Sequence, residues 1–212
     1  ISTSSVLREN LQVTARISAQ NISSNIHLLA DRMDNMAQKP EWSDAGNSSE
    51  EMQKLIDQTK ERIEFVWIAG YDISGKKLYG DSNAPDSIAG KEYYDYLVIT
   101  QNLTVGSPEY ADGLWQLSVG VPILDSEGAV LSYLVGSYKY DMLNDVLSNI
   151  SIGARGVAYI VDREGNIIAD KNVSDMGVSR NLYEMYGSAA NQRAFDAMLD
   201  FRTDVKSIFL KG

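Results

Sequence analysis

The sequence predicts an α+β fold in which a long N-terminal helix precedes antiparallel sheets. Two observations carry this prediction: the first 38 residues contain neither proline nor glycine, and three later segments repeat the order strand, Asp-x-x-Gly turn, strand. With 212 residues, of which 44% are apolar, the chain is long enough to bury a core of its own.

The N-terminal segment is expected to form one helix from residue 1 to about 38, and Pro40 ends it because proline has no N–H to donate. Its apolar positions are spaced by three and four residues and form a narrow seam. The seam comprises Leu11, Ala15, Ser18, Ile22, Ile26, Leu29, Met33 and Met36. Such a seam suits a helix packed on its own domain, or one that also pairs with a partner chain, and both interpretations stay open.

A second helix is expected from Ser48, a good N-cap residue followed by two acidic residues, to about Ile63. Strands and turns then alternate as far as residue 140. The three Asp-x-x-Gly segments span residues 67–78, 121–131 and 159–168. In each, the Asp side chain can accept hydrogen bonds from the following backbone and the Gly can adopt a positive φ, so each predicts a tight antiparallel hairpin. Calcium binding is not favoured there, because the loops lack the further ligands and the closing Glu of an EF-hand.

These patterns divide the chain into helices over 1–62, a first sheet module over 63–152 and a second over 153–212. A short helix at 141–150 marks the boundary between the modules. The second module adds only one hairpin, a helix at 191–201 and a strand at 205–210. We expect it to be incomplete, because one hairpin and one further strand make a poor sheet.

Composition argues against most enzymes. The absence of Cys excludes thiolate metal sites, iron–sulfur clusters and Cys nucleophiles, and His27 is the single His available for a catalytic triad or a His-rich metal site. Gly80-Asp81-Ser82 is similar to an esterase nucleophile block, but no later His could activate the serine. The acidic pairs 162/164 and 109/112 are better interpreted as solvated turns than as acid–base pairs. We therefore expect no catalytic residues, no metal and no cofactor.

The net charge of −10 would repel a phosphate backbone, so nucleic acid is not an expected partner. No apolar run reaches the length of a membrane helix, and the ragged N-terminus is typical of a piece cut from a longer protein that carries an anchor elsewhere.

Tyrosine is the more informative residue. Nine of the twelve lie between residues 71 and 140, a stretch that also contains Trp115 and begins just after Trp67. Tyrosine combines an apolar ring with a hydroxyl that needs a partner, which suits a site for a small, partly polar molecule. Tyr138 and Tyr140 alternate on a strand and must share one face, where they either line a pocket or cover the core.

Four segments in order resemble the double Cache domain, the extracytoplasmic ligand-binding region of bacterial methyl-accepting chemotaxis proteins, sensor kinases and diguanylate cyclases. Residues 90–97 (GKEYYDYL) look like the family's pocket helix, 104–110 (TVGSPEY) like the entry to its next strand, and 117–123 (LSVGVPI) like its strand ending in Pro-Ile. Residues 153–165 (GARGVAYIVDREG) resemble the start of its membrane-proximal module.

This resemblance implies a long helix rising from a first membrane span, a membrane-distal PAS-like module that binds ligand, and a truncated membrane-proximal PAS-like module leading to a second span. It also implies a homodimer formed through the N-terminal helix in the full receptor. In the amino-acid-binding members, an Arg, a Trp and a Tyr of the pocket helix grip the carboxylate and a later Asp takes the amine. Here Lys91 stands at the Arg, Tyr93 at the Trp, Tyr94 at the Tyr and Tyr138 at the Asp, so an α-amino acid is no better supported than an organic acid or an amine.

The expected function is therefore ligand sensing at the cell membrane, on its extracytoplasmic side, most directly for chemotaxis. The expected ligand-binding residues are Lys91, Tyr93, Tyr94, Tyr110, Trp115 and Tyr138, with Trp67 and Asp112 as second choices. The alternative is a structural or interaction module without a small ligand, which would apply if the tyrosine-rich face were filled by its own side chains.

Overall fold

The computed structural model describes residues 3–44, 47–148, 158–161, 164–170, 180–188, 191–193 and 195–196. The chain divides into two compact units. One is Asn25–Tyr140, called here the large-sheet unit, and the other is Ile1–Ser24 with Asp141–Gly212, the small-sheet unit. The strand expected at 205–210 and most of the helix expected at 191–201 lie outside the described residues.

Helix α1 (Thr3–Ala37) confirms the uninterrupted N-terminal helix. Its C-terminal part belongs to the large-sheet unit, and there Leu29, Met33, Met36 and Ala37 are buried. Three of these belong to the expected apolar seam, so this part of the seam packs on its own domain; pairing with a partner helix stays a prediction. Among the described residues, no helix is long and apolar enough to cross a membrane.

Helix α2 (Ser49–Gln58) begins where expected, because the Ser48 hydroxyl accepts from the Glu51 N–H while the Glu51 carboxylate accepts from the Ser48 N–H. The helix is shorter than predicted. Thr59 adopts an extended conformation and its hydroxyl donates to the Leu55 carbonyl, 2.9 Å away. A 3-10 helix, Lys60–Glu64, follows and leaves Ile63 92% exposed, so this apolar residue is not part of a helical seam.

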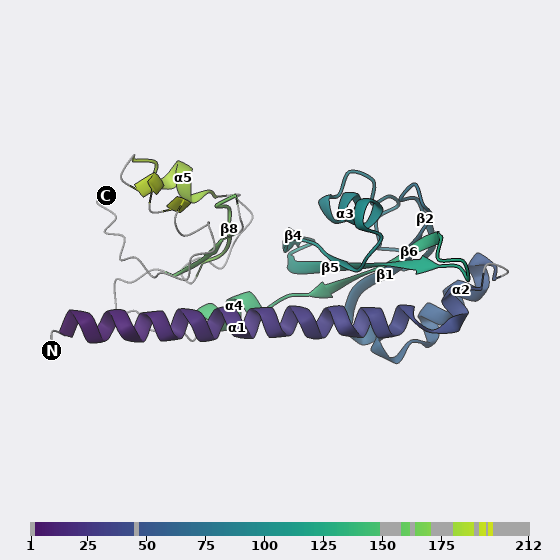
Figure 1. Ribbon diagram of the computed structural model, residues 1–212, viewed down its shortest axis with the longest axis horizontal. Helices are drawn as coiled ribbons and strands as arrows, with labels where there is room; N and C mark the ends of the chain where they lie inside the picture. Colours follow the sequence, from purple (N-terminus) through teal and green to yellow (C-terminus); the bar gives the residue numbers. More distant parts are fainter. Residues whose placement is uncertain are drawn as a thin grey trace. The chain divides into compact units, whose positions relative to one another are not determined.

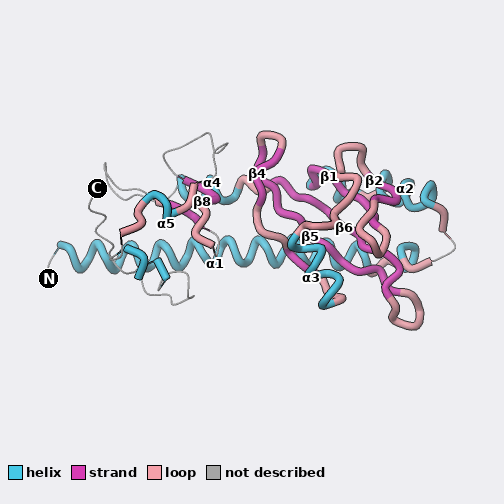
Figure 2. Tube along the Cα trace, turned by 90° about the horizontal axis from the view of Figure 1, so that it is seen from above, coloured by secondary structure: helices cyan, strands magenta, loops and turns pink. Residues whose placement is uncertain are grey.

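The large-sheet unit is built on an antiparallel sheet in the order β2-β1-β6-β5-β3, with β4 also paired to β5. Figure 2 shows its strands in magenta. The strands are β1 (Phe65–Tyr71), β2 (Lys77–Gly80), β3 (Thr104–Val105), β4 (Glu109–Ala111), β5 (Leu114–Leu124) and β6 (Val130–Lys139). The C-terminal part of α1 covers one face of this sheet, and helix α3 (Glu92–Thr100) covers the other (Figure 1). We call these the α1 face and the α3 face.

The predicted hairpins are present with the expected turn chemistry. The Asp72 carboxylate accepts from the N–H groups of Ser74 and Lys76 between β1 and β2, and Asp125 does the same for Glu127 and Ala129 between β5 and β6. Both turns close on a glycine with φ above +80°, Gly75 and Gly128.

The small-sheet unit repeats the β1–β2 arrangement. Strands β7 (Tyr159–Val161) and β8 (Ile167–Asp170) form an antiparallel hairpin whose turn contains Gly165 at φ 82°. The Leu182 N–H donates to the Gly165 carbonyl (2.9 Å), as the Ile88 N–H donates to the Gly75 carbonyl (2.8 Å). The described part of this unit also contains helices α4 (Met142–Ser148) and α5 (Leu182–Met185), and its sheet has two strands. The internal repeat seen in the sequence is therefore a structural repeat, and the second sheet is small, as expected.

Candidate ligand-binding site

The α3 face carries the aromatic cluster. Strand alternation and cross-strand register place Trp67, Ala69 and Tyr71 of β1 beside Tyr133 and Val135 of β6. The cluster is completed by Ala84, Ile88, Tyr93 and Leu97, with Val66, Tyr94 and Val130 packed against it. Helix α3 approaches closely because Gly120 of β5 has no side chain: a Cβ there would lie 2.5 Å from Leu97 Cδ1.

Three of the expected ligand-binding residues meet on this face. Trp67 and Tyr93 are buried in the cluster. The Tyr94 and Tyr133 rings pack edge to face, with their centroids 5.9 Å apart. The Tyr94 hydroxyl donates to the Ile73 carbonyl (3.0 Å) and is already partnered. Burial raises the pKa of the Tyr93 hydroxyl above its ordinary value, and the charge of Glu109 raises it further. Like any tyrosine, Tyr93 is protonated at neutral pH, and its hydroxyl can donate a hydrogen bond.

A buried polar strip runs beside the aromatic rings. The Ser137 hydroxyl donates to the Gln116 side-chain oxygen (2.9 Å), and the Gln116 amide donates to the Ala111 carbonyl (3.0 Å). The Ser118 hydroxyl forms a hydrogen bond with Tyr93. Sequence reasoning missed Gln116, Ser118 and Ser137, although their polar side chains interrupt strands that are otherwise buried, and that signal could have identified them.

Lys91 and Glu109 lie at the edge of the same face. Lys91 precedes α3, and its ammonium nitrogen lies 3.1 and 3.2 Å from the two carboxylate oxygens of Glu109 on β4. Glu109 is the direct cross-strand neighbour of Gln116, so the two side chains share the α3 face. The resemblance implies that Lys91 binds the carboxylate of a ligand. In the structure its ammonium is paired with the carboxylate of Glu109 instead.

The other expected residues lie on the opposite face. The Tyr138 hydroxyl donates to the Leu29 carbonyl of α1 (3.3 Å), and its ring contacts Phe65 at 4.4 Å. Leu117 of β5 is the cross-strand neighbour of Tyr138, and Trp115, two residues earlier on the same strand, shares its face. The ring centroids of Tyr110 and Trp115 are 5.5 Å apart. One small molecule cannot touch both faces of a sheet, so the expected residues do not form a single site. The sequence left open whether Tyr138 and Tyr140 line a pocket or cover the core. Both side chains are almost fully buried, so they cover the core.

Asp112 has a local explanation. It is exposed, with φ 53°, and precedes Gly113 with φ 78° at the tip of the β4–β5 hairpin. Two successive positive φ angles define a type I′ turn, which favours Asp-Gly. The identity of residue 112 is thus accounted for by the turn, and its position at the tip separates it from the aromatic cluster.

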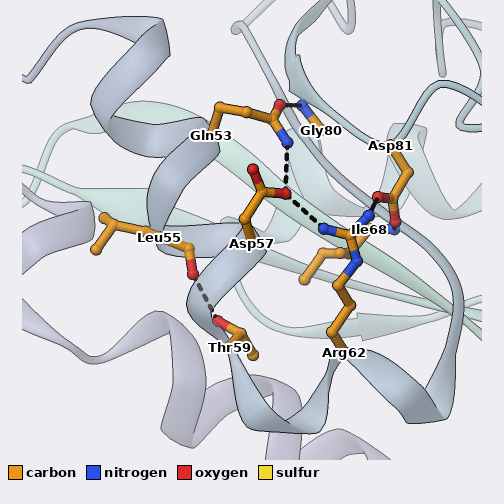
Figure 3. A network of polar contacts seen from close by, with 8 residues as sticks. All are labelled: Gln53, Leu55, Asp57, Thr59, Arg62, Ile68, Gly80 and Asp81. Atoms are coloured by element: carbon orange, nitrogen blue, oxygen red, sulfur yellow. Dashed lines mark hydrogen bonds and ion pairs between the residues drawn. The ribbon is translucent and has the colours of Figure 1, made fainter.

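Asp81, in the serine motif set aside above, is a structural residue. Its carboxylate accepts from the Ile68 N–H (2.9 Å) and pairs with Arg62, which also pairs with Asp57 of α2 (Figure 3). Gln53 of α2 joins this network through Asp57 and through the Gly80 N–H. The network ties α2 and the following 3-10 helix to β1 and β2. In the described part of the chain, no group of three or more His, Cys, Asp or Glu residues could hold a metal ion.

Comparison with protein families decides the identity. The model of the Cache domain matches residues 2–205, nearly the whole chain. The chain belongs to the Cache domain family. A search of curated proteins finds no match to this Cache domain.

Solved Cache-type structures share its fold at low sequence identity. The ligand-binding domain of the Pseudomonas aeruginosa PAO1 amino acid chemoreceptor PctC, in complex with GABA, has a TM-score of 0.69 at 19% identity, over 86% of this chain and 82% of that one. The ligand-binding domain of the Pseudomonas fluorescens chemoreceptor CtaA, in complex with L-isoleucine, has a TM-score of 0.65 at 19% sequence identity. The match covers 87% of this chain and 76% of that one. A domain of a putative sensory box/GGDEF family protein from Vibrio parahaemolyticus has a TM-score of 0.64 at 14% sequence identity. The match covers 89% of this chain and 83% of that one.

Proposed function

We propose that this Cache domain is the extracytoplasmic sensor of a bacterial transmembrane signalling receptor. It binds a small metabolite on the α3 face of the large-sheet unit, without chemistry, and signals across the membrane, most directly for chemotaxis. The observation that carries the proposal is the convergence on that face of aromatic rings, Trp67 and Tyr93 above all, with the buried polar groups of Gln116, Ser118 and Ser137.

This combination suits a ligand better than it suits a plain core. A core that served stability alone would need no buried amide and hydroxyls, because each must find a hydrogen-bond partner to offset its desolvation. Here Gln116 and Ser137 satisfy one another beside Trp67, the cross-strand neighbour of Ser137. Aromatic faces with a few placed polar groups are typical of small-molecule sites. The structurally similar chemoreceptor domains solved in complex with GABA and with L-isoleucine support the same class of function.

A homodimer formed through α1 is part of the proposal. Val13, Ile17 and Leu28 of this helix are 51%, 51% and 47% exposed. Steps of four and eleven residues keep these positions on one side of a helix, which offers a second copy an apolar stripe.

The second candidate is a structural or interaction module without a small ligand. It is favoured by the α1 face, where Tyr138 and Tyr140 are covered by the unit's own side chains. The two candidates differ in one measurable property, which is whether any small molecule stabilises the fold.

A thermal-shift screen of metabolites tests this. A ligand present at about 100 times its Kd stabilises the fold by about 2.7 kcal/mol, so the melting temperature rises with ligand concentration. Tyr93→Phe removes a hydroxyl from the α3 face and should abolish the shift. Tyr138→Phe removes a buried hydroxyl from the α1 face, which makes it the matched control and should keep the shift. Absence of any concentration-dependent shift across the screen favours the module without a ligand.

A further inference from the structure

We propose that residues 104–111, which contain β3 and β4, form a lid beside the α3 face, and that the Lys91–Glu109 ion pair holds this lid closed until a ligand enters. The inference rests on the proposed function, because it assigns a means of entry to the same site. Lys91 and Glu109 then control access to the site.

The polar groups of the proposed site are buried. Tyr93, Gln116, Ser118 and Ser137 are 4%, 5%, 9% and 0% exposed. A small molecule can form hydrogen bonds with such groups only after an element that covers them moves away. The site therefore needs a cover that opens, and the covering element with the weakest attachment opens first.

The lid is weakly attached to the sheet. Its strands β3 and β4 have two and three residues, and both pair with β5 at the outer edge of the sheet. Val105 is opposite Val119. Glu109, four residues later, is opposite Gln116, three residues earlier on β5, so the lid contains one extra residue. Such a bulge interrupts the ladder, and Pro108 within it has no N–H to donate, so few backbone hydrogen bonds oppose opening.

Two contacts between the lid and the start of α3 are also weak. Gly106 lies against the Tyr93 ring, since a Cβ at Gly106 would be 3.1 Å from Tyr93 Cδ1. The Ser107 hydroxyl is 3.5 Å from the Glu92 carboxylate, a long hydrogen bond between exposed groups. Both contacts can be broken without disturbing the rest of the sheet.

The Lys91–Glu109 ion pair is the shorter polar contact between the same two elements. The Lys91 ammonium lies 3.1 and 3.2 Å from the two Glu109 carboxylate oxygens, and the two side chains are 41% and 48% exposed. An ion pair with that exposure contributes modestly and is screened by salt. It can favour the closed lid and still break without unfolding of the unit.

An introduced thiol tests access to the α3 face, because the chain has no cysteine of its own. Ser118 is the β5 residue whose carbonyl accepts from the Gly106 N–H of the lid (2.8 Å). The alkylation rate of Ser118→Cys by iodoacetamide therefore reports opening of the lid. Ser132→Cys is the matched control, because Ser132 is 8% exposed against 9% for Ser118 but points to the α1 face.

Adding Lys91→Gln should speed alkylation of Ser118→Cys about two- to fivefold, the change that loss of an exposed ion pair can produce. Electrostatics alone predicts the opposite, because loss of a nearby cation disfavours the reactive thiolate. Raising NaCl from about 0.05 M to about 0.5 M should also speed alkylation when Lys91 is present, and not in Lys91→Gln. Exchanging the charges, with Lys91→Glu and Glu109→Lys together, should restore the slow rate.

The lid is overturned if Lys91→Gln leaves the Ser118→Cys rate unchanged or lowers it. It is also overturned if Ser132→Cys accelerates equally, because the whole unit has then loosened. Should circular dichroism show that Ser118→Cys does not fold, hydrogen exchange of the Gly106 amide makes the same comparison in the cysteine-free chain.

The metabolite screen separates this inference from the proposed function. If the lid fails its test while a metabolite stabilises the domain and Tyr93→Phe abolishes that stabilisation, the proposed function stands and the lid alone fails. If the lid opens as expected but no metabolite binds, both fail, because the lid then covers no ligand site.

Discussion

Replacing Asp81 by alanine should destabilise the large-sheet unit through one backbone contact. The Asp81 carboxylate accepts from the N–H of Ile68, a residue with no exposed surface, and pairs with the half-exposed guanidinium of Arg62 (Figure 3). Loss of a hydrogen bond to a charged group costs about 1.5–3 kcal/mol, and loss of a half-exposed ion pair adds roughly 0–1 kcal/mol. We therefore expect Asp81→Ala to lower the free energy of unfolding by about 1.5–4 kcal/mol.

The asparagine variant separates the two contributions. Asp81→Asn keeps an oxygen that can accept from the Ile68 N–H but removes the charge that attracts Arg62. The remaining hydrogen bond is neutral rather than charge-assisted and the ion pair contributes little, so Asp81→Asn should lower the free energy of unfolding by about 1–2 kcal/mol. Urea unfolding followed by tryptophan fluorescence measures both variants, with the midpoint moving and the slope unchanged. If asparagine destabilises as much as alanine, the backbone contact is not the dominant contribution and the reasoning is refuted.

Three further predictions concern the two faces of the sheet. Gly120→Ala places a methyl group against the Leu97 side chain, so Leu97 must repack or α3 must shift, and ligand affinity should fall. Titration with a ligand found in the screen measures this, and unchanged affinity would contradict the prediction. Tyr138→Phe loses the hydrogen bond to the Leu29 carbonyl and should lower the free energy of unfolding by about 1 kcal/mol in urea; no change would show that the bond contributes nothing. Burial raises the pKa of Tyr79 to about 12, so stability present below pH 10 should be lost as the pH rises from 10 to 12. Tyrosinate absorbance should then rise together with unfolding, and ionisation of every tyrosine near pH 10 without unfolding would refute the assignment.

The features that the sequence predicted correctly are those that depend on neighbours in the chain. The Asp72 and Asp125 turns form because an Asp side chain reaches the backbone two and four residues later, and Gly accepts the positive φ that closes the turn. The start of α2 follows in the same way from Ser48 and Glu51. Its early end at Thr59 was missed, because the helical spacing continues in the sequence after the backbone has turned.

The candidate site was harder to predict because it depends on contacts between distant residues. Alternation places Tyr138 and Tyr140 on one face, but which face meets α3 is decided by tertiary packing. The partner of Lys91 is 18 residues away on a strand of three residues, so no local pattern linked Glu109 to it. Tyr93, Tyr94 and Tyr138 were named from the resemblance, and Trp67 and Trp115 from the aromatic-rich stretch of the sequence. Trp67, Tyr93 and Tyr94 lie together, whereas Tyr110, Trp115 and Tyr138 lie on the other face.

Strand β6 serves both faces through consecutive residues. Ser137 points to the α3 face and bonds Gln116, while Tyr138 points to the α1 face and bonds the Leu29 carbonyl. For anyone redesigning this domain as a biosensor, the strand can therefore be treated as two independent sets of positions. Substitutions at Tyr133, Val135 and Ser137 would alter the proposed ligand-binding face, and Leu134, Gly136 and Tyr138 can be left untouched so that α1 keeps its attachment.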